Sequence, residues 1–278
     1  MITIQDLTFS YKKEFHLFKD LNLNLDQGKV YGLLGKNGAG KSTLLKQIAG
    51  LLFPQQGLCN VLDRTPKERS PEFLKEVFFI PEEFQFPSIK IEDYVKYHAP
   101  FYPRFDHKQF EQYLLEFRIT PDKKLSALSF GQKKKILVGF GLATNTKVLI
   151  LDEPTNGLDI PSKALFRKII ASSLSEERCM IISTHQVKDI ENLIDEIIIL
   201  DEGKIVFQQN LMSIAQKLSF SKVSEAEAKN GVVYSEGKLG LFNAISENRT
   251  DIDSNIDMEL LFNAVISDNT KIQEILNK

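Results

Sequence analysis

VYGLLGKNGAGKSTLLKQI, residues 30–48, is the stretch that decides the fold of this chain. It begins with a continuous apolar run, residues 30–34, which is typical of a buried strand, and leucines from Leu44 onward recur at helical spacing. Between them, residues 35–42 satisfy the pattern G-x-x-x-x-G-K-[ST], in the strand-loop-helix context that the pattern requires. The stretch therefore predicts a phosphate-binding loop in a P-loop NTPase core.

The chemistry of this loop indicates a nucleotide bound together with magnesium. Glycines let backbone N–H groups wrap around phosphates, and the N-terminus of the following helix adds partial positive charge. Lys41 is expected to reach the β- and γ-phosphates, and the hydroxyl of Ser42 to ligate Mg²⁺. The loop residues expected to bind the nucleotide are Gly35, Asn37, Gly38, Ala39, Gly40, Lys41, Ser42 and Thr43.

The flanking sequence predicts an α/β fold. Residues 1–29 alternate apolar and polar side chains, which predicts an N-terminal antiparallel β subdomain. The apolar runs 148–151 and 180–183 predict buried strands with a helix over 162–174 between them, an alternation that implies a parallel, doubly wound sheet. Helical spacing interrupted by prolines predicts a helical subdomain at about residues 84–140.

The character of the sequence changes after Gly203. Short β-like runs at 231–234 and 239–245 precede helical spacing from Met258 onward. We interpret residues 209–278 as a small α+β C-terminal domain with a dimer or regulatory role, or one that covers an exposed sheet edge, and favour a dimer contact.

Composition narrows the class of protein further. With 35 basic and 37 acidic residues the net charge is −2, which lacks the electrostatic footprint of a nucleic-acid-binding protein, so no nucleic acid is expected. No apolar run approaches the ~20 residues that cross a bilayer, and the N-terminus does not resemble a signal peptide. The cysteines, Cys59 and Cys179, form no CxxC pair, so we expect reduced, buried thiols in a cytoplasmic protein.

Two adjacent carboxylates follow the apolar run 148–151. Asp152 is placed to hold Mg²⁺ directly or through water, and Glu153 to orient or deprotonate an attacking water. Adjacent carboxylates at a strand end are commonly just solvated. In a chain that also carries a phosphate-binding loop, their position favours a catalytic role.

Three further motifs follow the loop in order: LSFGQ at 128–132, LILDEPTNGLD at 149–159 and STH at 183–185. With the phosphate-binding loop they resemble the ATP-binding subunit of ABC transporters over about residues 1–208. In that family two such domains face head to tail, and each ATP lies between the loop of one and the LSGGQ signature of the other. The resemblance implies that Ser129, Gly131 and Gln132 contact the partner's ATP.

The resemblance also assigns roles to residues outside the signature. Asp159 lies in the family's D-loop at the dimer seam, and His185 resembles the switch histidine that bonds the γ-phosphate. Tyr11 resembles the aromatic residue that stacks on adenine. Without the motifs, His185 and Tyr11 read as a structural histidine and a packed strand tyrosine.

Two positions depart from the common family pattern. Phe130 replaces the usual glycine of the signature, although we expect hydrolysis to be retained. At the Q-loop position stands Glu82, preceded by Pro81; it can still ligate Mg²⁺ but adds negative charge near the phosphates. The proline-glutamate pair is similar to the drug, bacitracin and sodium exporter branch, which favours export.

Two further stretches, one rich in aromatic residues and one rich in lysine, also have ordinary structural interpretations. An aromatic-rich stretch over residues 84–105 suits a groove that docks a membrane subunit, or forms the ordinary core of the helical subdomain. The three lysines at 133–135 are most simply a solvated helix face.

The predicted function is MgATP hydrolysis by a head-to-tail dimer, of this chain or with a paralogous ATPase, that powers an integral membrane permease from the cytoplasmic face of the membrane. The alternative is a soluble ABC ATPase acting on ribosomes or DNA. A nucleotide-sensing module is less favoured because Asp152 and Glu153 are intact, and a GTPase because no NKxD motif occurs.

Overall fold

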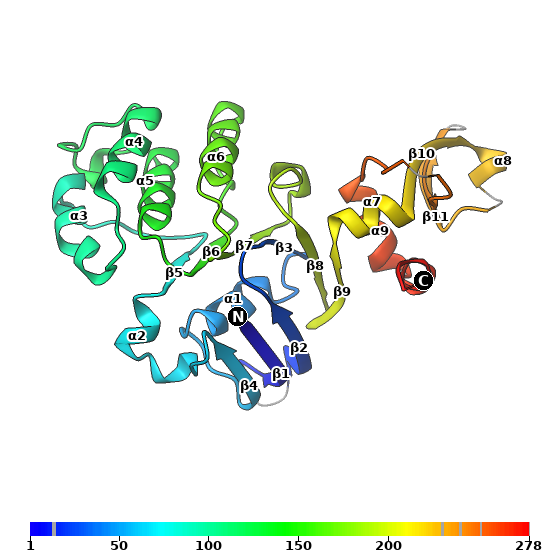
Figure 1. Cartoon of the computed structure of the whole chain (residues 1–278), viewed down its shortest axis with the longest axis horizontal. Coiled ribbons are helices and arrows are strands. Elements are labelled where there is room, and N and C mark those ends of the chain that lie inside the picture. Colours follow the sequence, from blue (N-terminus) through cyan, green and yellow to red (C-terminus); the bar gives the residue numbers. More distant parts are fainter. Residues whose placement is uncertain (13–14, 229–230, 239–240, 251, 278) are drawn as a thin grey trace.

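The computed structural model describes the chain except for residues 13–14, 229–230, 239–240, 251 and 278 (Figure 1). Its centre is a six-stranded sheet in the order β5-β6-β7-β3-β8-β9, in which β9 pairs antiparallel to β8 and the other pairs are parallel. The predicted doubly wound sheet is therefore present. Its strands are β3 (Val30–Leu34), β5 (Val77–Ile80), β6 (Val148–Asp152), β7 (Cys179–Thr184), β8 (Glu196–Asp201) and β9 (Lys204–Asn210).

The N-terminal residues form a second, antiparallel sheet in the order β2-β1-β4, as their alternating pattern predicts. The strands are β1 (Ile2–Phe9), β2 (Phe18–Leu25) and β4 (Gln56–Val61). Ile2 pairs with Leu25 and Ile4 with Leu23, and all of these side chains are buried. This face covers α1 (Lys41–Ile48), the helix that follows the phosphate-binding loop.

The predicted helical subdomain lies at one end of the molecule (Figure 1). It contains α3 (Ile91–His98), α4 (His107–Phe117) and α5 (Phe130–Ala143), joined by the 3₁₀ turns η2 (Ala99–Phe101) and η3 (Leu125–Ala127). Most aromatic side chains of residues 84–105 pack against Phe140 of α5 or against each other. The short segments η1 (Pro66–Glu68) and α2 (Pro71–Leu74) precede β5, and α6 (Ile160–Ser172) connects β6 to β7.

The C-terminal residues extend from β9 at the opposite end (Figure 1). A separate antiparallel sheet has the order β10-β12-β11, and its first strand was not expected from the sequence. The helical spacing from Met258 is interrupted at Asp268, so two helices form. The elements are α7 (Leu211–Lys217), β10 (Leu218–Ser224), α8 (Glu225–Ala228), β11 (Tyr234–Lys238), β12 (Leu241–Glu247), α9 (Met258–Ser267) and α10 (Thr270–Leu276).

The C-terminal elements share their apolar core with the central sheet. Leu218, Ile245 and Leu261 are fully buried in the same cluster as Ile197 and Phe207. Helix α9 packs against the 3₁₀ turn η4 (Val187–Asp189), which follows β7. The C-terminal residues are thus an integral part of the fold.

Both cysteines are free and buried, and burial raises the pKa of each thiol to about 12. Such thiols are unreactive near neutral pH because the thiolate is the nucleophile. In the part of the chain that the structure describes, no helix combines the length and the apolar character needed to cross a membrane.

Candidate active site

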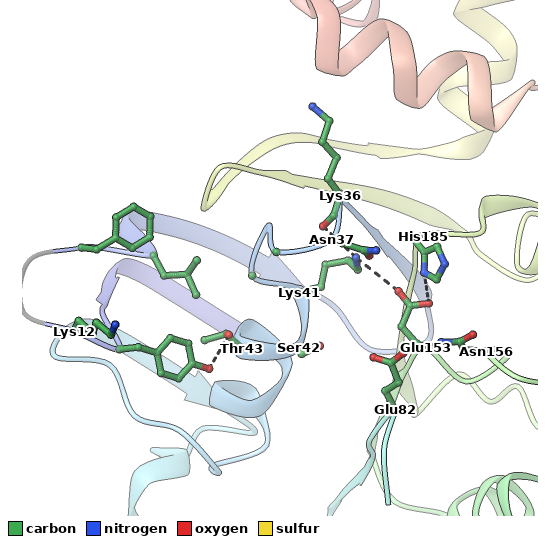
Figure 2. A pocket seen from close by; sticks show the side chains of 15 residues that line it. Lys12, Lys36, Asn37, Lys41, Ser42, Thr43, Glu82, Glu153, Asn156 and His185 are labelled. Carbon is green, nitrogen blue, oxygen red and sulfur yellow. Dashed lines mark hydrogen bonds and ion pairs between the residues drawn. The ribbon is translucent and has the colours of Figure 1, made fainter. Parts of the chain in front are cut away.

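A pocket of about 810 Å³ lies where the N-terminal sheet meets the carboxyl ends of the parallel strands (Figure 2). Ligands commonly bind at this edge of an open α/β sheet. Most of the residues that the sequence nominated meet here, although they come from distant segments. The pocket is lined by Tyr11, Lys12, Phe15, Leu17, Lys36, Asn37, Gly38, Gly40, Lys41, Ser42, Thr43, Glu82, Glu153, Asn156 and His185.

The glycines of the loop are required by its path. Gly40 caps the N-terminus of α1 at φ 110°, a conformation that favours glycine, and a Cβ there would lie 2.7 Å from the ring of Phe18. A Cβ on Gly35 would lie 2.4 Å from the carbonyl oxygen of Leu200 in β8. The loop therefore approaches its neighbours closely and leads into the N-terminus of α1, a position that favours an anion.

Lys41 folds back over the loop and is nearly buried. Its Nζ donates to the carbonyl oxygens of Gly35 at 2.8 Å and Lys36 at 3.4 Å, and lies 3.7 Å from Oε1 of Glu153. Figure 2 shows the ammonium pointing from the loop toward the carboxylate. A phosphate in the loop would meet this positive charge.

Glu153 stands at the centre of the polar contacts. Its Oε2 lies 2.9 Å from Nδ1 of His185, and its side chain is 7% exposed. The backbone N–H of Glu153 contacts the hydroxyl of Ser183 at 3.1 Å, and the residue adopts φ 44°. A left-handed glutamate costs of order 1–3 kcal/mol, and such strain concentrates at functional sites.

Asp152 occupies a different environment from its neighbour. Its Oδ1 accepts a hydrogen bond of 2.6 Å from the hydroxyl of Ser183, and the residue is buried. Among the described residues, neither Asp152 nor the predicted contacts Gly35 and Ala39 belong to the pocket lining. In the present arrangement Asp152 orders Ser183, which in turn holds the backbone of Glu153.

Glu82 lies in the pocket beneath Glu153 (Figure 2). Its Oε1 accepts a hydrogen bond of 2.7 Å from Nδ2 of Asn156, and its carbonyl oxygen accepts one of 3.1 Å from Nζ of Lys134. Asn156 was not singled out from the sequence, although it belongs to the quoted stretch 149–159. Its position three residues after Glu153 was the available signal.

The prediction that Lys133, Lys134 and Lys135 form a solvated helix face is wrong for Lys134. Its side chain is fully buried, because it turns inward from α5 toward the carbonyl of Glu82. Burial lowers the pKa of Lys134, and the carboxylates of Glu82, Asp152 and Glu153 act in the opposite direction. Helix α5 is largely buried, and the run of three lysines does not reveal that one of them faces inward.

The signature residues form the start of α5. Ser129 and Gln132 make a reciprocal capping box, in which Ser129 Oγ accepts from the N–H of Gln132 and Gln132 Oε1 from the N–H of Ser129. Asp159 caps α6 by accepting from the N–H of Ser162, a contact that lowers the pKa of its carboxyl. As far as the structure describes the chain, Ser129, Gly131, Gln132 and Asp159 do not line its own pocket.

Tyr11 lies at the mouth of the pocket. Its side chain is 63% exposed, its hydroxyl lies 2.9 Å from Oγ1 of Thr43, and its ring packs edge-on against Phe9. Phe15, 70% exposed, also lines this end and was missed because its segment has no periodic pattern. The mouth therefore presents two exposed aromatic rings, a surface suited to a planar base.

The oxygen donors of the pocket suit magnesium. Ser42 and Glu82 line it and offer a hydroxyl and a carboxylate, while Asp152 is held by Ser183. No group of three or more His, Cys, Asp or Glu side chains that could hold a metal ion occurs within the described ranges. Magnesium commonly keeps several waters and is bound through one or two protein oxygens plus phosphates.

The parallel sheet, the phosphate-binding loop and the lysine-glutamate-histidine contacts define a P-loop ATPase cassette. The chain belongs to the ABC transporter family, whose pattern matches residues 18–156, half of the chain. Its membership establishes ATP binding, and ATP hydrolysis coupled to transport, as its activity. The predicted family and enzyme class are therefore confirmed.

Several relatives span most of the chain. ABC transporter ATP-binding protein NatA of Bacillus subtilis is 29% identical over 77% of this chain and 91% of its own length. Lantibiotic transport ATP-binding protein SrtF of Streptococcus pyogenes is 33% identical over 75% of this chain and 90% of its own. Energy-coupling factor transporter ATP-binding protein EcfA2 of Staphylococcus epidermidis is 33% identical over 71% of this chain and 74% of its own.

Solved structures confirm the fold class. An ATP-binding subunit of an ABC transporter superposes with a TM-score of 0.70 at 24% identity, covering 77% of this chain and 91% of that one. The ATP-binding cassette MJ0796 in its dimeric form gives a TM-score of 0.66 at 21% identity, covering 76% and 98%.

Proposed function

We propose that this chain hydrolyses MgATP as a head-to-tail dimer, with itself or a paralogous ATPase, and drives an integral membrane permease from the cytoplasmic face. The observation that carries the proposal is Glu153, held between Lys41 and His185 in the pocket that contains the phosphate-binding loop. This arrangement supplies positive charge, a carboxylate base and a histidine where a terminal phosphate would lie.

Each side chain has a defined task in this proposal. Lys41 binds the β- and γ-phosphates, Glu153 accepts a proton from the attacking water, and His185 contacts the γ-phosphate. Ser42, Glu82 and Asp152 would hold Mg²⁺, Asp152 directly or through water, and the ion would supply positive charge that neutralises the phosphates. Tyr11 stacks on the adenine at the pocket mouth.

The dimer follows from residues that lie outside the chain's own pocket. Ser129 and Asp159 are exposed, and Gly131 and Gln132 are half-buried, so these residues can meet a second cassette at the surface. Ile160 is 82% exposed and Phe130 48% exposed beside them, so an apolar rim accompanies these polar groups. Each ATP would then contact the loop of one chain and the signature of the other.

Export is the direction that we propose. It is supported by Glu82 after Pro81 at the Q-loop position and by the likeness to a lantibiotic transport protein. The energy-coupling factor relative is equally identical, so identity alone does not set the direction. ATP-driven transport of a candidate substrate in inverted vesicles, with MgATP outside, tests the direction. Uptake into the vesicles supports export, and loss from preloaded vesicles contradicts export.

The membrane partner is tested by affinity purification of the chain from detergent-solubilised membranes of its own cell. A polytopic membrane protein recovered in stoichiometric amount is the expected result. Recovery only from the soluble fraction, together with ribosomes or DNA-processing proteins, would contradict the transporter and favour the alternative ABC ATPase. The partner's own sequence would then lead to the substrate.

We propose that residues 209–278 affect dimerisation through the segment that contains His185 and η4 (Val187–Asp189). Lys188 in η4 forms an ion pair of 3.0 Å with Glu259 of α9. Phe262 of α9 borders a cavity of about 250 Å³ that is also lined by Asn37 and His185. Helix α9 therefore lies beside both the phosphate-binding loop and His185.

Deleting residues 216–278 is expected to weaken nucleotide-driven dimerisation, measured by sedimentation of the Glu153→Gln chain with MgATP. Because the deletion removes buried core residues, Phe262→Ala provides a milder test, with the exposed Leu241→Ala as its control. We expect Phe262→Ala to lower the dimer fraction and Leu241→Ala to leave it unchanged. Unaltered dimerisation of both the deletion and Phe262→Ala would reject this role.

A further inference from the structure

Lys134 is a lysine in a place where lysines are rarely found. It lies on α5, two residues after the signature at 128–132, and its side chain is fully buried. Its Nζ donates to a backbone carbonyl, that of Glu82, at 3.1 Å. Burying an ammonium is costly unless it gains compensating contacts, so its surroundings indicate what holds it there.

Two aromatic rings form one side of these surroundings. Phe84 and Phe130 stack with their centroids 5.6 Å apart and an interplanar angle of 28°. Nζ of Lys134 lies 5.7 Å from the first centroid and 5.8 Å from the second, within the range of a cation–π attraction. Phe130, the departure from the usual signature glycine, thus contributes a ring to the lysine's site.

The other side of the surroundings is acidic. The carboxylates of Glu82, Asp152 and Glu153 are the negative charges that act on the ammonium. Glu82 is held at both ends, because its carbonyl accepts from Lys134 and its carboxylate from Asn156. The buried ammonium is therefore bonded to the backbone of Glu82, an acidic residue that lines the pocket.

We propose that Lys134 is a positioning residue of the ATP site, which fixes the backbone of Glu82 and offsets the negative charge that Glu82 adds beside the phosphates. The inference rests on the proposed function, since it concerns the residue proposed to hold Mg²⁺. Lys134 also connects the signature at the start of α5 with the chain's own ATP site. The helix that begins at the signature, and would face the partner's ATP, contacts through Lys134 a residue that lines the chain's own pocket, Glu82.

The physical basis is the strength of charge interactions away from water. In a low-dielectric interior a charge acts on its neighbours far more strongly than at the surface. Removing the cation alone leaves carboxylates that repel an incoming phosphate. Removing the charge of Glu82 at the same time removes part of that repulsion, so the two effects should depend on each other.

A double-mutant cycle with Lys134→Met and Glu82→Gln tests this dependence. Methionine keeps the apolar stem and packs well between aromatic rings, so it removes the charge with little loss of packing. We expect Lys134→Met to raise the Kd for magnesium-AMPPNP and the KM for MgATP roughly tenfold in the parent chain. In the Glu82→Gln background the same change is expected to cost less than about threefold.

Lys134→Gln gives a second measurement that keeps a donor for the carbonyl of Glu82 but lacks the charge. We expect it to weaken binding in the parent chain and to be relieved by Glu82→Gln as well. Lys133→Met, at the partly exposed position before it, is the matched control and should change Kd by less than about twofold.

The opposing outcomes are distinct. Equal losses in both backgrounds would mean that Lys134 does not offset the charge of Glu82, and no loss from Lys134→Met or Lys134→Gln would also overturn the inference. Thermal unfolding of each variant identifies any loss that comes from misfolding. Binding of magnesium-AMPPNP needs neither hydrolysis nor a permease, so failure of the proposed function is recognised separately from failure of this inference.

Discussion

Glu153→Gln is expected to lower kcat for MgATP hydrolysis by a factor on the order of 10²–10⁴, because it removes the general base. Glutamine has nearly the same shape and can still meet His185, but its amide cannot take a proton from water. The nucleotide should therefore bind without being consumed, and the dimer that it bridges should accumulate. Phosphate release and sedimentation with MgATP measure the two effects.

The control for this variant is Glu177→Gln, an exposed glutamate in the turn before β7. It loses the same charge away from the pocket and should hydrolyse ATP at the parent rate. If Glu153→Gln also kept the parent rate, Glu153 would not be the base. Loss of turnover without any accumulated dimer would leave the base in place but contradict the proposed bridging of two chains.

Much of this site was predictable because its parts are local. The loop at residues 35–42 needs only a strand before it and a helix after it, and both patterns are visible in a few residues. Glu153 follows an apolar run, His185 was assigned through the resemblance of the STH motif to the family, and the carboxyl ends of parallel strands meet at one edge. The pairing of β6 with β7 brings the two side chains to 2.9 Å.

The features that the sequence did not predict depend on contacts between segments that are distant in the chain. The buried Lys134 donates to the carbonyl of Glu82, which lies 52 residues earlier, and a run of lysines carries no sign of which one turns inward. Strand β10 has a largely polar sequence and is formed by pairing with β12. The approach of Phe262 to His185 likewise results from packing of α9 on η4, which no local pattern indicates.

Lys41→Met is expected to weaken MgATP binding roughly 10- to 100-fold, as loss of a charged hydrogen bond worth about 1.5–3 kcal/mol implies. Lys41 is the ammonium that the loop itself positions, through the carbonyl of Gly35 at 2.8 Å, and it also approaches Glu153. Methionine keeps the length of the side chain but cannot neutralise a phosphate.

The rise in Tm caused by MgATP measures this loss directly. A ligand at a hundred times its Kd stabilises the folded state by about 2.7 kcal/mol, and a hundredfold weaker site reduces that at the same concentration to about 0.4 kcal/mol. Lys46→Met, on the same helix but partly exposed and outside the pocket lining of the described residues, should keep the full rise. An unchanged rise in Lys41→Met would show that the backbone of the loop, rather than its lysine, provides the affinity. It would contradict the proposed mechanism, in which Lys41 binds the γ-phosphate beside Glu153.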